Sequence, residues 1–174
     1  LVENHLEQEI TWATLYYMAE SALKREQLDL AKGWFSLLSE KGSSEQYKVH
    51  GVAGLFWVAT KNDRPHLAGA LFERLREHYP QSKHTCEAAM ARGKYLEDAR
   101  QYRQAVEMYA FVHTRFENSP LAPTAIVRHG YSLHKVGGKH NLEAARKILL
   151  SYVDDPANQK KIDEAVKEIW FDDK

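Results

Sequence analysis

Apolar residues recur every three or four positions along most of the chain, in segments separated by short turns rich in Gly, Pro, Asn, Asp and Ser. This spacing places apolar side chains on one face of an amphipathic α-helix. No segment alternates apolar and polar residues in the way that indicates a strand. The pattern predicts nine helices, over residues 3–25, 28–39, 45–61, 66–79, 85–99, 102–116, 122–136, 142–152 and 157–171.

The helical pattern repeats along the chain. An alanine followed four positions later by a large ring occurs at three places 37 residues apart: Ala31 and Phe35, Ala68 and Phe72, Ala105 and Tyr109. Gly93 and Gly130 share this spacing, each near the middle of a predicted helix. The same step from alanine to a large residue recurs at Ala144 and Ile148. A repeat of this length indicates an array of similar supersecondary units.

Close helix packing explains why small and large residues alternate in this way. Two antiparallel helices approach closely only where one of them presents a small side chain. A glycine inside a helix costs about 1 kcal/mol relative to alanine, so Gly93 and Gly130 need a compensating contact. We therefore predict that each glycine accommodates a bulky neighbour, a steric role and not a catalytic one.

The pattern resembles the tetratricopeptide repeat. Its characteristic small and large positions are matched by Ala19, Ala31 and Phe35 in the first repeat, by Gly93, Ala105 and Tyr109 in the third, and by Gly130, Ala144 and Ile148 in the fourth. The second repeat departs, because Gly54 stands fourteen residues before Ala68 instead of twelve, and the fourth repeat has the same two-residue excess between Gly130 and Ala144. Either the first helix of the second repeat is shifted or its turn is longer.

The resemblance implies an all-α fold, a right-handed superhelical solenoid of antiparallel helix pairs in a single domain over residues 1–174. The four repeats would cover 3–42, 45–82, 85–119 and 122–156, followed by a capping helix at 157–171. That last helix carries an apolar stripe of Ile162, Ala165, Val166, Ile169 and Trp170. The stripe either closes the end of the stack or receives another subunit.

In the tetratricopeptide family, the first helices of the repeats line a concave groove that holds a peptide or a partner domain. The resemblance assigns ten residues of this chain to that groove: Tyr16, Glu20, Leu23, Trp57, Met90, Lys94, Glu97, Val127, Tyr131 and His134. For Tyr16, Trp57 and Tyr131, packing between helices is an equally good interpretation. The implied function is a non-catalytic scaffold that binds another protein.

Composition narrows the classes of partner. The 24 basic and 24 acidic residues balance, so no strong field favours nucleic acid or an anionic membrane. No apolar run is long enough for a membrane-spanning helix, and the single cysteine, Cys86, suits the cytosol and the periplasm equally. The turn at 116–125 resembles turns of bacterial cell-envelope members of the family, such as outer-membrane assembly lipoproteins and periplasmic partners of the Tol system. This resemblance implies a periplasmic or envelope location.

Catalytic, cofactor and metal sites are not predicted. Cys86 has His84 two residues before it, a spacing that points the side chains apart on a helix. His129, His134 and His140 lack a matching carboxylate, and the histidines are interpreted as scattered surface residues. Gly137 and Gly138 lack the rest of a phosphate-binding loop. Because the chain starts at Leu1 within a predicted helix, an accessory domain of a larger enzyme or secretion protein is an alternative function. Self-association through the end helices is another.

Overall fold

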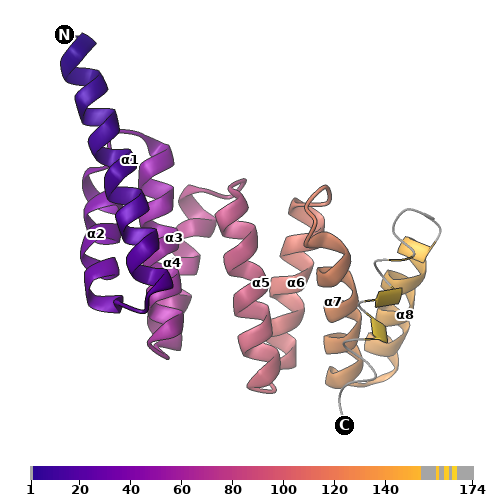
Figure 1. Cartoon of the computed structure of the whole chain (residues 1–174). Helices are drawn as coiled ribbons and strands as arrows, with labels where there is room; N and C mark the ends of the chain where they lie inside the picture. Colours follow the sequence, from indigo (N-terminus) through magenta and orange to yellow (C-terminus); the bar gives the residue numbers. More distant parts are fainter. Residues whose placement is uncertain (1, 154–159, 161–162, 165, 168–174) are drawn as a thin grey trace. The chain divides into compact units, whose positions relative to one another are not determined.

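A computed structural model describes residues 2–153, 160, 163–164 and 166–167, and Figure 1 shows its course. Within these residues the chain is helical and contains no strand, which confirms the all-α class. The helices are α1 (Val2–Lys24), α2 (Leu28–Lys41), α3 (Glu45–Lys61), α4 (Pro65–His78), α5 (Lys83–Asp98), α6 (Tyr102–Arg115), α7 (Ala122–Val136) and α8 (Lys139–Val153). All of them match predicted helices to within three residues at each end.

The chain divides into two compact units, Leu1–Ala88 and Ala89–Lys174, and the boundary falls inside α5. In the first unit, α2 packs against α1 and α3, α4 packs against α3, and α1 also contacts α3. In the second unit, α7 packs against both α6 and α8. Consecutive helices therefore form the hairpins that the pattern predicts.

The predicted alanines and rings form the core of these hairpins. Five of these residues are completely buried: Ala31, Phe35, Phe72, Ala105 and Tyr109. The sixth, Ala68, is 6% exposed. In the first unit, Phe35 belongs to a cluster that Trp12, Tyr16, Trp34 and Trp57 cover as partly buried neighbours. The alanines and rings that define the repeat are thus packing residues.

The turn inside each hairpin shows the repeat in the backbone. Glu26, Asp63 and Arg100 stand 37 residues apart and have φ of 60°, 50° and 58°, a left-handed conformation in which glycine is usual. The next residue donates its N–H to the carbonyl five positions back, from Gln27 to Ala22, from Arg64 to Ala59 and from Gln101 to Leu96, at 2.9, 2.9 and 2.7 Å. This is the Schellman geometry that ends a helix.

The irregularity of the second repeat does not lie in its turn. The Asp63 turn has the same hydrogen bonds as its equivalents, so the turn is not longer. Phe56 stands 37 residues before Gly93 and is 1% exposed, so a large residue occupies the usual small position. Gly54 serves another contact, since a Cβ there would overlap the ring of Phe35 on α2.

The fourth repeat corrects one prediction. Gly130 faces Leu149, and the buried alanine of α8 is Ala145, at 5% exposure. The sequence predicted Ala144 and Ile148 for these two packing positions, and each prediction is wrong by one residue. Leu142, which stands 37 residues after Ala105, is too large for a close helix contact and is 44% exposed. The helices meet one turn further along α8 instead.

The predicted C-terminal helix at 157–171 lies mostly outside the described residues. Val166, a described member of its apolar stripe, packs against the cluster of Val127 and Tyr131. This contact lies within the chain's own second unit, as expected for a residue that closes a core.

Candidate functional site

Rings from three different helices meet on the first unit. The ring of Tyr16 on α1 lies 4.3 Å from that of His50 on α3, and the His50 ring lies 4.8 Å from that of His84 on α5. Tyr17 extends the row, with its ring centroid 5.4 Å from that of Tyr16. We call Tyr17, Tyr16, His50 and His84 the ring row. It joins the first helices of three successive hairpins.

Local packing fixes the histidines of the ring row. His50 precedes Gly51, whose lack of a side chain lets α3 approach the backbone of Ser39 on α2, because a Cβ there would lie 2.6 Å from the Ser39 Cα. At the start of α5, the Ser82 hydroxyl accepts the backbone N–H of His84 at 3.2 Å, as an N-cap does. The buried Thr85 hydroxyl also donates to the Tyr79 carbonyl at 2.7 Å. Both histidines are therefore held by the backbone around them.

The histidines of the ring row are neutral at neutral pH. Burial, with smaller contributions from His84 and Lys83, lowers the pKa of His50 from 6.5 to about 4. The Nδ1 atom of His50 is buried without a hydrogen-bond partner among the described residues, which opposes protonation there. Burial also lowers the pKa of His84, although the Glu87 carboxylate, 3.4 Å from its Nδ1 atom, opposes the shift.

The outer end of the ring row is open to solvent. Tyr17 is 69% exposed, and Met18 beside it is 43% exposed. Exposed large apolar residues beside stacked rings are the composition found at the centre of protein interfaces, where Tyr and Met are enriched. The arrangement can hold another molecule against its ring faces, and it contains no nucleophile paired with a base.

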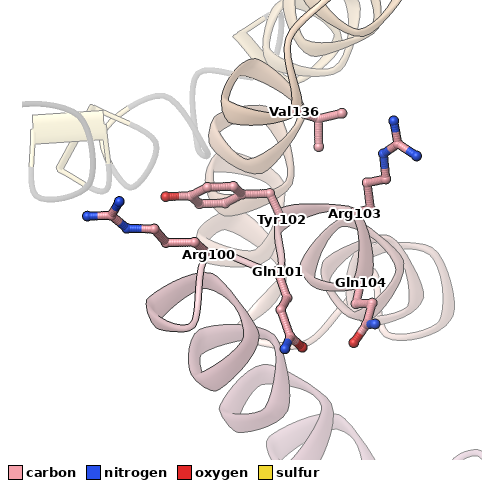
Figure 2. Close-up of a pocket in the computed structure, with 6 residues that line it drawn as sticks. All are labelled: Arg100, Gln101, Tyr102, Arg103, Gln104 and Val136. Atoms are coloured by element: carbon pink, nitrogen blue, oxygen red, sulfur yellow. The ribbon is translucent and has the colours of Figure 1, made fainter.

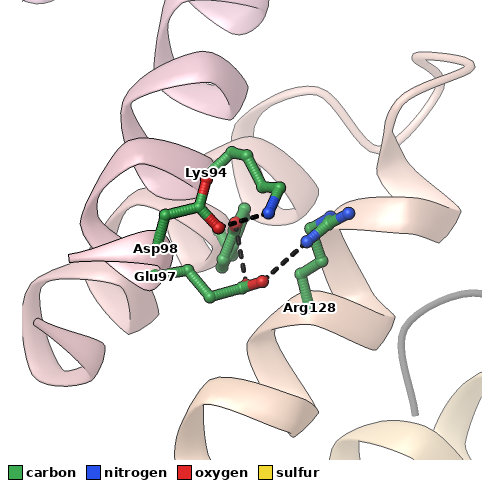
Figure 3. Close-up of polar contacts among 5 residues, drawn as sticks. Lys94, Glu97, Asp98 and Arg128 are labelled. Carbon is green, nitrogen blue, oxygen red and sulfur yellow. Dashed lines mark hydrogen bonds and ion pairs between the residues drawn. The ribbon is translucent and has the colours of Figure 1, made fainter. Parts of the chain in front are cut away.

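A second polar cluster lies inside the second unit (Figure 3). Glu97 on α5 accepts hydrogen bonds from the Tyr109 hydroxyl of α6 at 3.0 Å and from the Arg128 guanidinium of α7 at 2.7 Å. Lys94 and Asp98, one turn apart on α5, form a neighbouring ion pair. Burial raises the pKa of Glu97, and Arg128 and Tyr109 oppose the shift. The cluster ties three helices together, which is a structural role.

Two histidines pair between α6 and α7. The Nε2 atom of His113 lies 2.8 Å from the Nδ1 atom of His129, so the two rings share one hydrogen bond. Burial lowers the pKa of both, and that of His129 falls from 6.5 to about 4. The prediction that the histidines are surface residues is confirmed for His134 and His140, which are exposed, and is wrong for His129, which is 8% exposed because it packs against His113 of α6. His129 is thus a packing residue with a partner on the preceding helix.

An open pocket of about 360 Å³ lies near the start of α6. Its lining residues are Arg100, Gln101, Tyr102, Arg103, Gln104 and Val136. Figure 2 shows Arg100 extended alongside the Tyr102 ring, whereas Arg103 points toward Val136. The two guanidinium groups diverge, so they do not form a two-point clamp for one anion.

The residues assigned to the groove fall into different environments. Tyr16 belongs to the ring row, and Glu20 follows it by one helical turn. The others divide into core residues (Leu23, Val127 and Tyr131), partly buried residues (Trp57 and Met90), the buried Glu97, and the exposed Lys94 and His134. Val127 is completely buried and so presents no surface to a partner. Of the assigned residues, Tyr16 contacts the exposed ring of Tyr17, and Glu20 acts electrostatically on Tyr16.

Sequence reasoning missed His50, His84 and Glu87. A signal was present, because His50 and Glu87 stand 37 residues apart and hence occupy equivalent positions on α3 and α5. Successive first helices bring such equivalent positions beside each other. A histidine and a carboxylate at one repeated position could therefore have indicated a shared surface.

A metal-binding cluster and a membrane-spanning helix are both absent from the described residues. No three His, Cys, Asp or Glu side chains in that part of the chain come together to hold a metal ion. None of its helices combines the length and apolar character needed to cross a membrane. Protein-family models, curated proteins and solved structures were compared with the chain, and none of them matches.

Proposed function

We propose that this chain is a protein-binding scaffold of the tetratricopeptide type, which holds a partner through its first helices and catalyses no reaction. In this proposal its hairpins continue as a right-handed solenoid. The ring row carries the proposal. It brings exposed Tyr17 together with rings of α1, α3 and α5, the helices that line the groove in such an array.

The repeated backbone supports the assignment to this type. Hairpin turns of one geometry recur every 37 residues at Glu26, Asp63 and Arg100. Ser82 and Ser119, also 37 residues apart, accept backbone N–H groups at the turns between hairpins, each at 3.2 Å. An array built from equivalent units presents equivalent helix faces side by side, and extended partners bind along such faces.

Affinity capture with matched surface variants tests the proposal. The double variant Tyr17→Ser, Met18→Ser removes the exposed ring of Tyr17 from the ring row and the exposed Met18 side chain beside it. The control Leu30→Ser, Leu37→Ser changes side chains of similar exposure on α2, at 46% and 38%. We expect the first variant to lose a specific partner that the wild type and the control retain. Equal capture by all three would contradict binding at the ring row.

A further inference from the structure

We propose that the ring row binds a positively charged side chain, preferably an arginine, in a basic segment of the partner protein. This inference rests on the proposed function and specifies its partner. It follows from the charges that surround the neutral rings and from the chemistry of the ring faces.

Two carboxylates, one on α1 and one on α5, act on the ring row. Glu20 lies one turn after Tyr16 on α1, a spacing that places both side chains on one helix face. Glu87 on α5 lies 3.4 Å from His84. Both carboxylates act on Tyr16, since after burial they contribute, with Tyr17, to raising the pKa of its hydroxyl. Glu20 and Glu87 therefore both act electrostatically on Tyr16.

The nearby positive charge is smaller. Lys83 acts on both histidines, but its side chain is 78% exposed and its ammonium lies 4.0 Å from Glu87. Neutral His50 and His84 add no positive charge near pH 7. Among the described residues, two carboxylates and one solvated ammonium therefore act on the ring row, and this balance attracts a cation and repels an anion.

A guanidinium suits this surface better than any other common side chain. Its plane stacks on aromatic faces, and its fork of N–H donors matches a carboxylate. A cation over an exposed ring contributes about 0.5–1 kcal/mol, and more where water is excluded. The exposed ring of Tyr17 offers such a face, and Glu87, which is 39% exposed and contacts Lys83 and His84, has the capacity to accept further hydrogen bonds.

A pair of isosteric peptides tests the inference. The probe is an acetylated Gly-Arg-Gly amide, and its control replaces arginine with citrulline, which has the same shape and no charge. Binding is followed by the nuclear magnetic resonance signals of the Tyr16, Tyr17, His50 and His84 rings. We expect saturable shifts with the arginine peptide, with a dissociation constant of about 30 mM, because one exposed ion pair and one exposed ring contact are each weak.

The double variant Glu20→Gln, Glu87→Gln keeps the shape of both side chains and removes their charge. We expect it to bind the arginine peptide about tenfold more weakly, because charge-assisted hydrogen bonds are lost. Its circular dichroism should match that of the wild type. Equal binding of the citrulline peptide, unchanged affinity of the variant, or no shift at about 100 mM arginine peptide would each overturn the inference. Loss of a partner by Tyr17→Ser, Met18→Ser would still stand in those cases, so the two proposals fail separately.

Discussion

The ring of Tyr109 lies directly on Gly93, so that a Cβ at position 93 would fall 2.6 Å from the Tyr109 Cε1 atom. Phe35 lies against Gly54 in the same way, and a Cβ at position 130 would fall 3.0 Å from the Leu149 Cγ atom. Each glycine belongs to the first helix of a hairpin and admits a large side chain of a neighbouring second helix. The cost of a glycine inside a helix is thus offset by close packing.

Alanine at position 54 should therefore destabilise the protein. Gly54→Ala gains helix propensity but forces the buried Phe35 ring to move, and we expect a net loss of about 2 kcal/mol in the free energy of unfolding. Gly33→Ala is the matched control, because nothing lies within 4 Å of a Cβ there. We expect the control to gain up to about 1 kcal/mol. Urea unfolding measures both, and equal effects would show that Phe35 does not need Gly54.

The left-handed residues of the hairpin turns predict a stabilising substitution. Asp63 has φ of 50°, a conformation that strains a residue with a side chain. Asp63→Gly relieves this strain and loses part of the gain to the greater freedom of the unfolded chain, so we expect a net gain of about 0.5–1 kcal/mol. The control Lys32→Gly, at an exposed site inside α2, should lose about 1 kcal/mol. A drop in melting temperature for Asp63→Gly would contradict the turn geometry.

The ion pair of Glu97 and Arg128 predicts a non-additive effect. Both side chains are nearly buried, at 9% and 13% exposure, so Arg128→Met leaves a buried carboxylate whose remaining hydrogen-bond donor among the described residues is the Tyr109 hydroxyl. We expect a loss of about 3 kcal/mol. Adding Glu97→Gln removes the stranded charge and keeps an acceptor for Tyr109, so the double variant should be more stable than Arg128→Met alone. Additive losses in chemical unfolding would rule out this account.

The pair of His113 and His129 predicts loss of stability in acid. Burial holds the folded pKa of His129 near 4, below the ordinary value of 6.5 that applies to the unfolded chain. The unfolded state therefore binds the proton first, so the stability is fully present above pH 6.5 and is lost as the pH falls toward 4. We expect His129 to contribute on the order of 2 kcal/mol to this loss.

The variant His113→Gln, His129→Gln isolates that contribution. Glutamine can keep a hydrogen bond between α6 and α7 and does not titrate in this range. Its free energy of unfolding should fall less than that of the wild type between pH 7.5 and 5. The pH dependence that remains in the variant is due in part to His50 and His84, whose pKa values are also lowered. Identical pH profiles would mean that the pair carries no such linkage.

The sequence predicted the helices and most of the close contacts, because periodicity and small residues act locally. It placed the fourth contact at Ala144 and Ile148, whereas the structure uses Ala145 and Leu149. Neighbouring positions on an apolar helix face cannot be separated by spacing alone. The left-handed turns were hidden because Glu26, Asp63 and Arg100 are not glycines.

The candidate site was predicted only in part. Tyr16 and Glu20 were assigned from the repeat pattern, but His50 and His84 contribute from other helices, 34 and 68 residues further along the chain. The pairing of His113 with His129 was missed for the same reason. Contacts between helices depend on how each helix is rotated, and the burial that neutralises these histidines has no local sequence signal.

Photo-crosslinking from Tyr17 tests the central claim most directly. A photoreactive benzoylphenylalanine replaces Tyr17 in one sample and Leu67, an exposed residue of α4, in the other. Both proteins are irradiated in an extract of the source organism, and the products are identified by mass spectrometry. Binding at the ring row predicts one specific adduct from position 17 and none from position 67. Adducts from position 67 alone, or equal adducts from both positions, would contradict it.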